Sequence, residues 1–418
     1  MRLGDTMRSL RSRRPASKRA RSDASGSIGV LFLHTATRPP LGADTWVQGQ
    51  IISGLDKASH RVFVACAGSV SDTTPTRTMV AAVPDITIVP TNLGPEIGGG
   101  SLASKARAAL ATLPAPISIL RLIRVIRSER IQWVHTTDRP RDAFAAVLLS
   151  RLTPARCMIH AHVAFDASWM SSMLQRSMQR ADALVAISDY VAVSLRESGH
   201  RADRIHVVKN ATDIERWTPG IDREARRAEL ACTAEDVLII TVARLFPAKG
   251  PAELIRAVAE VRAAGRRARL VIVGHEMIPG YAAELQRLVT ELGLDDHVVF
   301  TGRRGDVAAL MAAADIFAMP SMFEPFGLVY LEAMAMQRPV VALDNGGTPE
   351  VVDHGVTGLL SPAHDIAAFA TNLLTLIDDA ELRATMGRAG RVLVEHHFTR
   401  QRLAADMGRL YRRLESAR

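Results

Sequence analysis

Two cations stand close together just after an apolar run in this 418-residue sequence. The run Val237–Val242 leads into a loop that carries Arg244 and Lys249. Arginine offers a planar pair of donors and lysine a compact charge, so the two side chains can converge on one diphosphate group. The alternative interpretation is a pair of solvated loop charges.

Two carboxylates follow another such run. Ile316–Met319 leads into Glu324, and Glu332 lies further along the chain. Pro325 disfavours helix at the residue before it and suits the first turn of a helix beyond. We therefore predict Glu324 at the mouth of a helix and Glu332 about two turns in, both facing a cleft. The first amides of this helix would bind phosphate; the alternative is a surface helix with two solvated acids.

A pair of glycines follows a third run, Val340–Leu343. Gly346 and Gly347 allow a close approach of backbone, and Thr348 is predicted to cap a helix whose first residue is Pro349. This segment is a candidate second phosphate cradle. A glycine turn followed by a cap is also simply a good turn.

The first half of the chain offers fewer candidates. Gly42 lies in the loop after the run Ile28–Leu33, and His160 and His162 flank one alanine at the end of a later run. We expect the two histidine rings to face opposite sides of the chain. They would then not share a metal ion, and at most one would reach the cleft.

The candidate residues can form one site only if the ends of their strands lie close together in the fold. Short apolar runs alternate with segments of helical spacing, which is typical of parallel α/β sheets. Ligands of such sheets bind beyond the carboxyl ends of the strands. The predicted strands are Ile28–Leu33, Arg61–Cys66, Ile86–Val89, Ile131–His135, Cys157–His160, Ala183–Ile187, Ile205–Val208, Val237–Val242, Ala268–Val273, His297–Thr301, Ile316–Met319 and Val340–Leu343.

The length predicts two domains, because a single core stops growing well before 418 residues. We predict two Rossmann-like, doubly wound parallel-sheet domains that face a cleft. The segment Asn210–Gly220 is rich in turn residues and is the candidate link. The predicted parts are a disordered basic tail (1–26), an N-terminal domain (27–212), a C-terminal domain (213–395) and an amphipathic helix that packs back on the first domain (396–418).

Charge and cysteine content narrow the class of function. The net charge is +9, but residues 1–26 hold eight basic and two acidic side chains, so the rest is nearly neutral and no nucleic-acid partner is expected. The three cysteines lack metal or redox spacing, and no stretch reaches the roughly 20 apolar residues of a membrane span. We predict a cytoplasmic protein. The tail and a helical face with Arg121, Arg124 and Arg127 are candidates for peripheral contact with the inner face of an anionic membrane, although such faces are more often solvated.

Together, these motifs resemble the family-4 retaining glycosyltransferases of GT-B fold over most of the chain, from Ile28 to Leu414. The order of the motifs is more specific than any one of them. The resemblance rests on the hinge turn Asn210-Ala211-Thr212-Asp213, the loop Val242-Ala243-Arg244-Leu245…Lys249-Gly250, the Glu-x7-Glu motif Glu324…Glu332, and the segment Gly346-Gly347…Glu350-Val351-Val352.

The resemblance implies a role for each candidate. Arg244 and Lys249 would bind the donor diphosphate, Glu324 the hydroxyls of the transferred sugar, and Glu332 the ribose hydroxyls. His162 falls where the family has its first-domain active-site histidine, with His160 as the less suitable choice. The implied catalytic residues are Glu324, His162, Arg244 and Lys249, and the implied donor-binding residues are Glu332, Phe326, Gly327, Leu328, Gly42, Gly346, Gly347 and Asn210.

Three positions depart from the family pattern. Ala43 stands where the first-domain loop usually has a second glycine, Ala243 precedes Arg244 in place of glycine, and Ala211 replaces the hinge glycine. The change at Ala43 is expected to narrow the approach of phosphate or to mark an unusual acceptor.

The implied reaction transfers a sugar from a UDP- or GDP-linked donor to a lipid, saccharide or small-molecule acceptor with retention of configuration. Two cations and helix termini would stabilise the leaving diphosphate. No Asp-x-Asp triplet is placed to hold a metal, so we expect neither metal nor cofactor. The alternatives are a non-catalytic nucleotide-sugar-binding protein, a GT-B enzyme of another type such as an epimerase or phosphorylase, and a membrane-surface scaffold.

Overall fold

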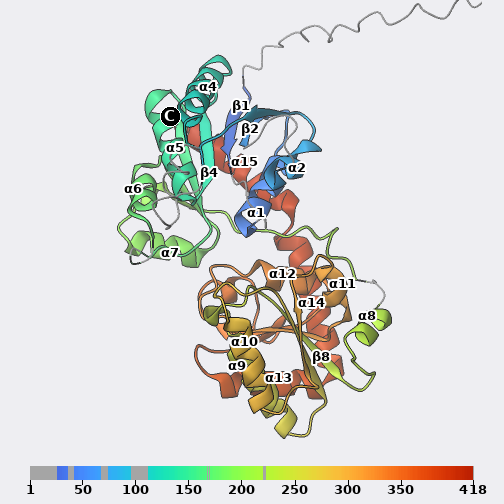
Figure 1. Ribbon diagram of the computed structural model, residues 1–418. Helices are drawn as coiled ribbons and strands as arrows, with labels where there is room; N and C mark the ends of the chain where they lie inside the picture. Colours follow the sequence, from blue (N-terminus) through green and yellow to red (C-terminus); the bar gives the residue numbers. More distant parts are fainter. Residues whose placement is uncertain are drawn as a thin grey trace, which may run out of the picture.

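The computed structural model describes residues 26–35, 42–66, 74–95, 112–166, 168, 170–219 and 223–417. The predicted basic tail lies outside these ranges except for its last residue, Gly26. Two α/β domains follow one another along the chain, each built on a parallel sheet (Figure 1). The predicted fold class, two doubly wound parallel-sheet domains, is confirmed.

The N-terminal sheet has the strand order β3-β2-β1-β4-β5-β6-β7, and its pairs are parallel. Its strands are β1 (Ile28–Leu33), β2 (His60–Cys66), β3 (Ile86–Pro90), β4 (Trp133–Thr137), β5 (Arg156–Ala161), β6 (Ala183–Ala186) and β7 (Ile205–Val207). Every residue of β1 is buried. A strand covered on both faces reads as a continuous apolar run, which is why the sequence located it.

Helices cover both faces of this sheet. They are α1 (Ala43–Gly54), α2 (Pro75–Ala81), α4 (Ala115–Ser128), α5 (Pro140–Leu152), α6 (Ser172–Arg180) and α7 (Asp189–Glu197). In Figure 1, α7 lies at the end of this domain that faces the second domain. The amino end of α7 is therefore placed to touch the second domain.

The C-terminal sheet has the order β10-β9-β8-β11-β12-β13 and is also parallel. Its strands are β8 (Val237–Val242), β9 (Ala268–Val273), β10 (Val298–Gly302), β11 (Ile316–Met319), β12 (Val340–Asp344) and β13 (Gly358–Pro362). Its helices are α8 (Arg223–Glu229), α9 (Pro251–Ala263), α10 (Tyr281–Glu291), α11 (Val307–Ala313), α12 (Leu328–Ala335), α13 (Ile366–Asp378) and α14 (Ala380–His397). Sequence analysis did not find β13, whose five residues begin with glycine and end with proline.

Each sheet reverses its winding direction at one point. In the first domain, β1 and β4 are neighbours; in the second, β8 and β11 are neighbours. The connections from such a pair leave toward opposite sides, which opens a crevice at the carboxyl ends of the two strands. The loops after β8 and β11 carry the two charged motifs of the sequence, so the topology brings these motifs to one crevice.

The last helix, α15 (Arg400–Ser416), lies against the N-terminal domain and packs on α1 (Figure 1). The Tyr411 hydroxyl is 2.5 Å from Nδ1 of His135 on β4, and the phenol ring is buried. The Thr212 amide donates to the Phe398 carbonyl at 2.9 Å. The chain thus passes between the domains twice, along two neighbouring segments.

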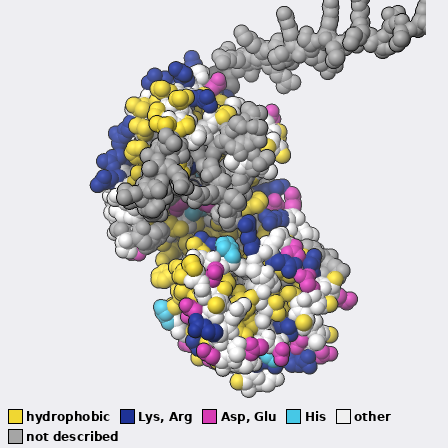
Figure 2. Space-filling model, viewed as in Figure 1, with side chains coloured by type: hydrophobic (Ala, Val, Ile, Leu, Met, Phe, Trp, Pro, Cys, Tyr) yellow, Lys and Arg dark blue, Asp and Glu magenta, His cyan; other side chains and the backbone are white. Residues whose placement is uncertain are grey.

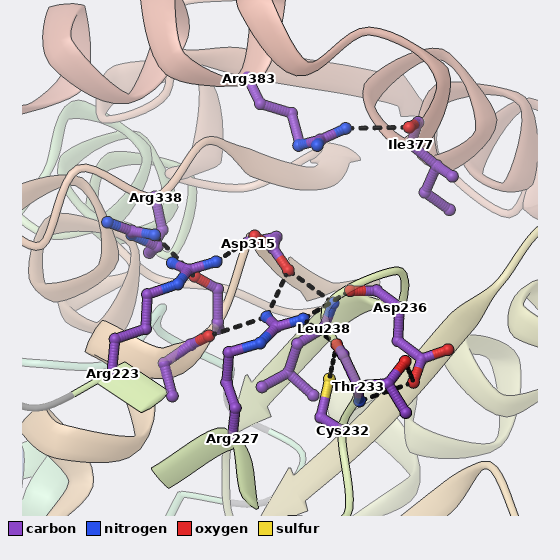
Figure 3. A network of polar contacts seen from close by, with 12 residues as sticks. Arg223, Arg227, Cys232, Thr233, Asp236, Leu238, Asp315, Arg338, Ile377 and Arg383 are labelled. Carbon is purple, nitrogen blue, oxygen red and sulfur yellow. Dashed lines mark hydrogen bonds and ion pairs between the residues drawn. The ribbon is translucent and has the colours of Figure 1, made fainter. Parts of the chain in front are cut away.

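A polar network fixes the other end of β8 and β11 (Figure 3). Asp315, just before β11, accepts from Arg223 and Arg227 of α8 and from the Leu238 amide of β8. Arg338 donates to the Ala314 carbonyl at 2.7 Å. These bonds tie α8 and both strands together at the edge away from the crevice, so the two loops that carry the charged motifs rise from anchored strands.

Candidate active site

The loops after β8 and β11 are bound to one another. The Met322 amide donates to the Ala248 carbonyl at 2.8 Å. Gly250 has a φ of +70°, and a Cβ there would lie 2.2 Å from the Pro320 carbonyl oxygen. Only glycine combines this conformation with this approach. The two loops therefore form one unit at the crevice.

Lys249 and Glu324 form an ion pair in this unit. The Lys249 Nζ lies 2.7 Å from the Glu324 Oε2, and the glutamate is buried, with 7% of its surface exposed. The structure thus brings together two predicted site residues from different loops. A diphosphate would compete with Glu324 for the lysine, and sugar hydroxyls would take over the carboxylate. The pair therefore offers a cation and a carboxylate side by side, an arrangement that suits a ligand carrying a diphosphate and sugar hydroxyls.

Arg244 lies on the same loop but differs in its surroundings. Its side chain is exposed, and none of the carboxylates in the described part of the chain pairs with it.

The helix that carries Glu332 begins later than predicted. Gly327 has a φ of +95° and caps α12, so the helix starts at Leu328 rather than near Pro325. Glu332 is consequently about one turn into the helix, and the prediction of two turns was wrong. The Phe326 ring is buried against Phe398, with 6.0 Å between ring centroids. Only the backbone of Phe326 is left to contact a donor.

Glu332 lines a cavity of about 490 Å³ between the two domains. Burial raises the pKa of Glu332 to about 7, and the charge of Arg216 opposes this rise. The guanidinium carbon of Arg216 lies 5.0 Å from the ring centroid of Trp46 on α1 and 5.5 Å from that of Trp217. Ala43 lines the same cavity, so the position that departs from the family pattern is part of the cleft wall.

The glycine turn after β12 packs closely against the loop that carries Glu324. The Gly347 amide donates to the Glu324 carbonyl at 2.8 Å. A Cβ on Gly346 would lie 2.5 Å from the same carbonyl oxygen, and one on Gly347 2.3 Å from the Pro325 carbonyl oxygen. The close approach expected of the glycines is therefore to backbone. The predicted helix cap at Thr348 was wrong, because the segment is a three-residue 3-10 turn (Thr348–Glu350) capped by Gly347.

Gly42 and Asp44 stand at the start of α1, facing the N-terminal side of the cleft. Gly42 caps the helix through its carbonyl. Asp44 forms an ion pair with Arg139 at 2.7 Å. The pKa of Asp44 falls to about 2, because the bonds and charge of Arg139 outweigh burial.

The two histidines at the end of β5 lie side by side. Their ring centroids are 4.5 Å apart, so the prediction that they face opposite sides was wrong. Residues two apart along an extended chain share a face. His160 is fully buried on the strand, whereas His162 follows the strand end, and its amide donates to Asp138 Oδ2 at 2.7 Å. None of the four ring nitrogens has a hydrogen-bond partner among the described residues.

Burial sets the protonation of this cluster. It lowers the pKa of His162, although Asp138 and Asp44 act in the opposite direction, and it raises the pKa of Asp138. A neutral imidazole beside a carboxyl group can accept or donate a proton. His162 is thus the better placed of the two histidines to contact a hydroxyl group.

Asn210 lies in the link between the domains. Its carbonyl accepts from Arg402 of α15 at 3.0 Å, and its side chain is buried. The following residues Ala211 to Asp213 line the interdomain cavity, but Asn210 itself does not. Its contacts are those of a connecting segment, and a direct donor contact remains a prediction.

Sequence reasoning missed several residues of the cleft. Trp46 and Arg216 meet across it, and Ser188, at the start of α7, donates to the Pro325 carbonyl at 2.7 Å. Ser188 stands directly before a helix, as a capping residue does, and this was the available signal. Nothing in the spacing of the sequence pairs Trp46 with Arg216. Over the described residues, no group of three or more His, Cys, Asp or Glu side chains is arranged to hold a metal ion.

Comparison with known proteins places this geometry in a family. Residues 222–393 match the family described as glycosyl transferases group 1, and residues 49–216 match Glycosyltransferase Family 4. The chain is 33% identical over 305 residues to the GDP-mannose-dependent monoacylated alpha-(1-6)-phosphatidylinositol monomannoside mannosyltransferase of Corynebacterium glutamicum. That match covers 69% of this chain and 78% of the relative. The chain therefore belongs to the family-4, group 1 glycosyltransferases.

A second relative is similar over a shorter stretch. The D-inositol 3-phosphate glycosyltransferase of Corynebacterium efficiens is 43% identical over 218 residues. This match covers 50% of this chain and 51% of that relative, so the chain spans about half of its length.

Solved structures share the architecture. HepE of Anabaena, in complex with UDP and glucose, superposes with a TM-score of 0.74 over 91% of this chain and 98% of its own, at 23% identity. WaaG, a glycosyltransferase involved in lipopolysaccharide biosynthesis, superposes with a TM-score of 0.64 at 16% identity. The fold is GT-B.

Proposed function

We propose that this protein transfers a sugar from a UDP- or GDP-linked donor to an acceptor hydroxyl, with retention of anomeric configuration and without a metal ion or other cofactor. The observation that carries the proposal is the Lys249–Glu324 pair, which lies where β8 and β11 diverge. A cation for the diphosphate and a carboxylate for the sugar stand side by side there, as a sugar nucleotide requires.

The proposed reaction uses these positions. The bond between the anomeric carbon and the diphosphate oxygen breaks, and the diphosphate leaves with the electron pair. Lys249 and Arg244 stabilise that charge. The acceptor oxygen attacks the same face of the sugar, and its proton passes to the departing phosphate. Closure of the cleft excludes water, which would otherwise hydrolyse the donor.

Glu332 would hold the ribose of the donor in the cavity beside Trp46 and Arg216. A carboxylate accepts two hydroxyl hydrogen bonds best when it is ionised. Burial raises the pKa of Glu332 to about 7, and the positive charge of Arg216 acts to lower it. Arg216 therefore favours the ionised carboxylate near neutral pH.

The acceptor is proposed to be an inositol that carries a phosphate group, either free or as a phospholipid headgroup. This proposal is supported by the relatives, one named for D-inositol 3-phosphate and another for a phosphatidylinositol mannoside. His162 and the Asp44–Arg139 pair supply neutral and charged groups on that side of the cleft.

A peripheral membrane contact accompanies this proposal. The outward face of α4 begins with large apolar side chains, Ile117 (65% exposed) and Leu120 (54% exposed), and ends with exposed Arg121, Arg124 and Arg127. Figure 2 shows basic side chains at the edge of an apolar area on this domain. Such a surface fits an anionic bilayer at the cytoplasmic face. No helix within the described ranges is long and apolar enough to cross a membrane.

The contact is tested with vesicles. Replacing Arg121, Arg124 and Arg127 together by Gln should abolish sedimentation with anionic vesicles. Replacing the exposed Arg256, Arg287 and Arg388 of the second domain by Gln should leave sedimentation with the vesicles unchanged. Equal loss in both triple variants, or binding unchanged in the first, contradicts this surface.

The reaction is tested by product analysis. The purified protein is incubated with UDP- and GDP-sugars and with D-inositol 3-phosphate, inositol or phosphatidylinositol vesicles, and products are identified by mass spectrometry and NMR. Transfer to a phosphorylated inositol with the donor's anomeric configuration supports the proposal. Thermal stabilisation by a donor without transfer to any acceptor favours a non-catalytic nucleotide-sugar-binding protein. Absence of any nucleotide-sugar binding contradicts both.

A further inference from the structure

The amino end of α7 in the first domain binds the Glu324 loop of the second. Ser188 is fully buried at this end. Its hydroxyl donates to the Pro325 carbonyl at 2.7 Å and accepts from the Val191 amide at 3.0 Å. One side chain therefore caps its own helix and holds a carbonyl of the other domain.

The same helix end binds a second point of the C-terminal domain. The Glu350 carboxylate accepts the amides of Asp189 and Tyr190 at 2.9 and 2.8 Å and lies 3.0 Å from the Lys209 Nζ. The amides at the start of a helix favour an anion, and lysine adds an opposite charge. Lys209 precedes the segment that links the domains, so this contact lies next to the expected hinge.

The two contacts flank one piece of backbone. Pro325 directly follows Glu324, and Glu350 follows the glycine turn that is bonded to the Glu324 carbonyl. The Gly347 amide donates to the Glu324 carbonyl, and a Cβ on Gly347 would lie 2.3 Å from the Pro325 carbonyl oxygen, so the turn and the loop pack backbone against backbone. Holding both ends from α7 therefore fixes the backbone that carries Glu324.

We propose that Ser188 and Glu350 are positioning residues that couple docking of the N-terminal domain to the geometry of the Glu324 loop. Separation of the domains at α7 breaks the bonds to Pro325 and Glu350 together and releases this loop. Docking restores the bonds and holds Glu324 for the sugar. The functional consequence rests on the role proposed for Glu324, whereas the mechanical coupling does not.

The variants separate coupling from helix capping. Ser188→Asp keeps a side-chain acceptor for the cap but places a carboxylate against the Pro325 carbonyl, with no hydrogen to donate. Ser171→Asp makes the same substitution at the cap of α6, where the serine accepts from the Leu174 amide, and is the matched control. Glu350→Gln removes the charge at the second contact. Asp378→Asn removes an exposed ion pair with Arg266 and is its control.

Hydrogen exchange of the full-length chain gives the decisive readout. In Ser188→Asp and Glu350→Gln, amides of residues 323–333 and 344–352 should exchange about tenfold faster, as expected when a buried hydrogen bond is lost. The controls should match the wild type in these segments. Unchanged exchange in Glu350→Gln overturns the proposal, and this variant decides the question if Ser188→Asp does not fold.

Steady-state kinetics then distinguish a failure of the positioning role from a failure of the proposed reaction. In an active enzyme, Glu350→Gln should raise the donor KM severalfold and leave the acceptor KM unchanged, because the donor loop alone is released. An equal rise in both constants contradicts the positioning role. If the wild type transfers no sugar, the exchange experiment still tests the coupling while the proposed reaction fails.

Discussion

The candidate site residues of the two domains differ in how completely their side-chain polar groups are satisfied. On the C-terminal side, Lys249 and Glu324 are paired, and the carbonyl of Glu324 accepts the Gly347 amide. On the N-terminal side, ring nitrogens of His135, His160 and His162 are buried without a partner among the described residues. Such groups are costly unless a ligand or water satisfies them.

This difference indicates that the two sides of the cleft have separate roles in binding. On the proposed donor side, Lys249 and Glu324 are already paired and are held by neighbouring loops. On the proposed acceptor side, His162 follows the end of β5 and carries a neutral, unpaired imidazole near the Asp44–Arg139 pair, whereas His160 is fully buried.

Glu324→Gln should have the largest effect. The substitution keeps the size of the side chain but removes the charge that pairs with Lys249 and binds the sugar. We expect turnover to fall by about 10²- to 10³-fold, the range for loss of one preorganised group. Diphosphate release measures it, with Glu260→Gln on the exposed face of α9 as control. Unchanged turnover would place the chemistry elsewhere.

Lys249→Met and Arg244→Met compare the two cations of one loop. Lys249 is already beside Glu324, whereas Arg244 points to solvent. We expect about a hundredfold loss of turnover for Lys249→Met and about tenfold for Arg244→Met. Lys249→Met should also reduce the unfolding free energy by about 1–3 kcal/mol, because it leaves Glu324 buried and unpaired. A larger effect of Arg244→Met on turnover would reverse the assignment.

Glu332 should make donor binding depend on pH. Its pKa is raised to about 7, so the carboxylate that accepts ribose hydroxyls forms as the pH rises through that value. The donor KM should therefore fall between about pH 6 and 8, by up to tenfold per unit below the pKa. Glu332→Gln should give a flat, weaker profile. A wild-type profile that is flat over this range contradicts the role of Glu332.

The pH dependence of the unfolding free energy tests the buried, unpartnered ring of His160. Burial lowers the pKa of His160 well below 6.5. Below about pH 6.5, the imidazole is therefore protonated in the unfolded chain while it stays neutral in the folded chain. Stability is therefore complete above about pH 6.5 and is lost as the pH falls below it. His160→Leu should unfold like the wild type at about pH 8 and lose less stability toward about pH 5. A steeper acid loss in the variant would show that His160 is protonated in the folded state.

The sequence predicted the scaffold more fully than the contacts made across the cleft. β8, β9 and β11 begin and end where predicted, because a parallel strand buried on both faces is a continuous apolar run. The same reasoning missed β13, which is short and bounded by glycine and proline. The start of α12 was misplaced because the left-handed conformation of Gly327, rather than Pro325, sets it.

Contacts between domains could not be derived from local patterns. Ser188 and Pro325 are 137 positions apart, and Trp46 meets Arg216 only because α1 faces the link between the domains. Periodicity reports which face of an element is buried but not which distant element covers it. The motifs did place Lys249 and Glu324 correctly, since the carboxyl ends of adjacent strands must meet.

Turnover with and without EDTA shows whether the Lys249–Glu324 site transfers a sugar with protein charges alone. The donor and acceptor found by product analysis would be used with metal-free enzyme, and diphosphate release would be followed. The account predicts equal rates with EDTA and with added Mg²⁺ or Mn²⁺, and release that requires the acceptor. A rate that collapses in EDTA and returns with a divalent ion would contradict it.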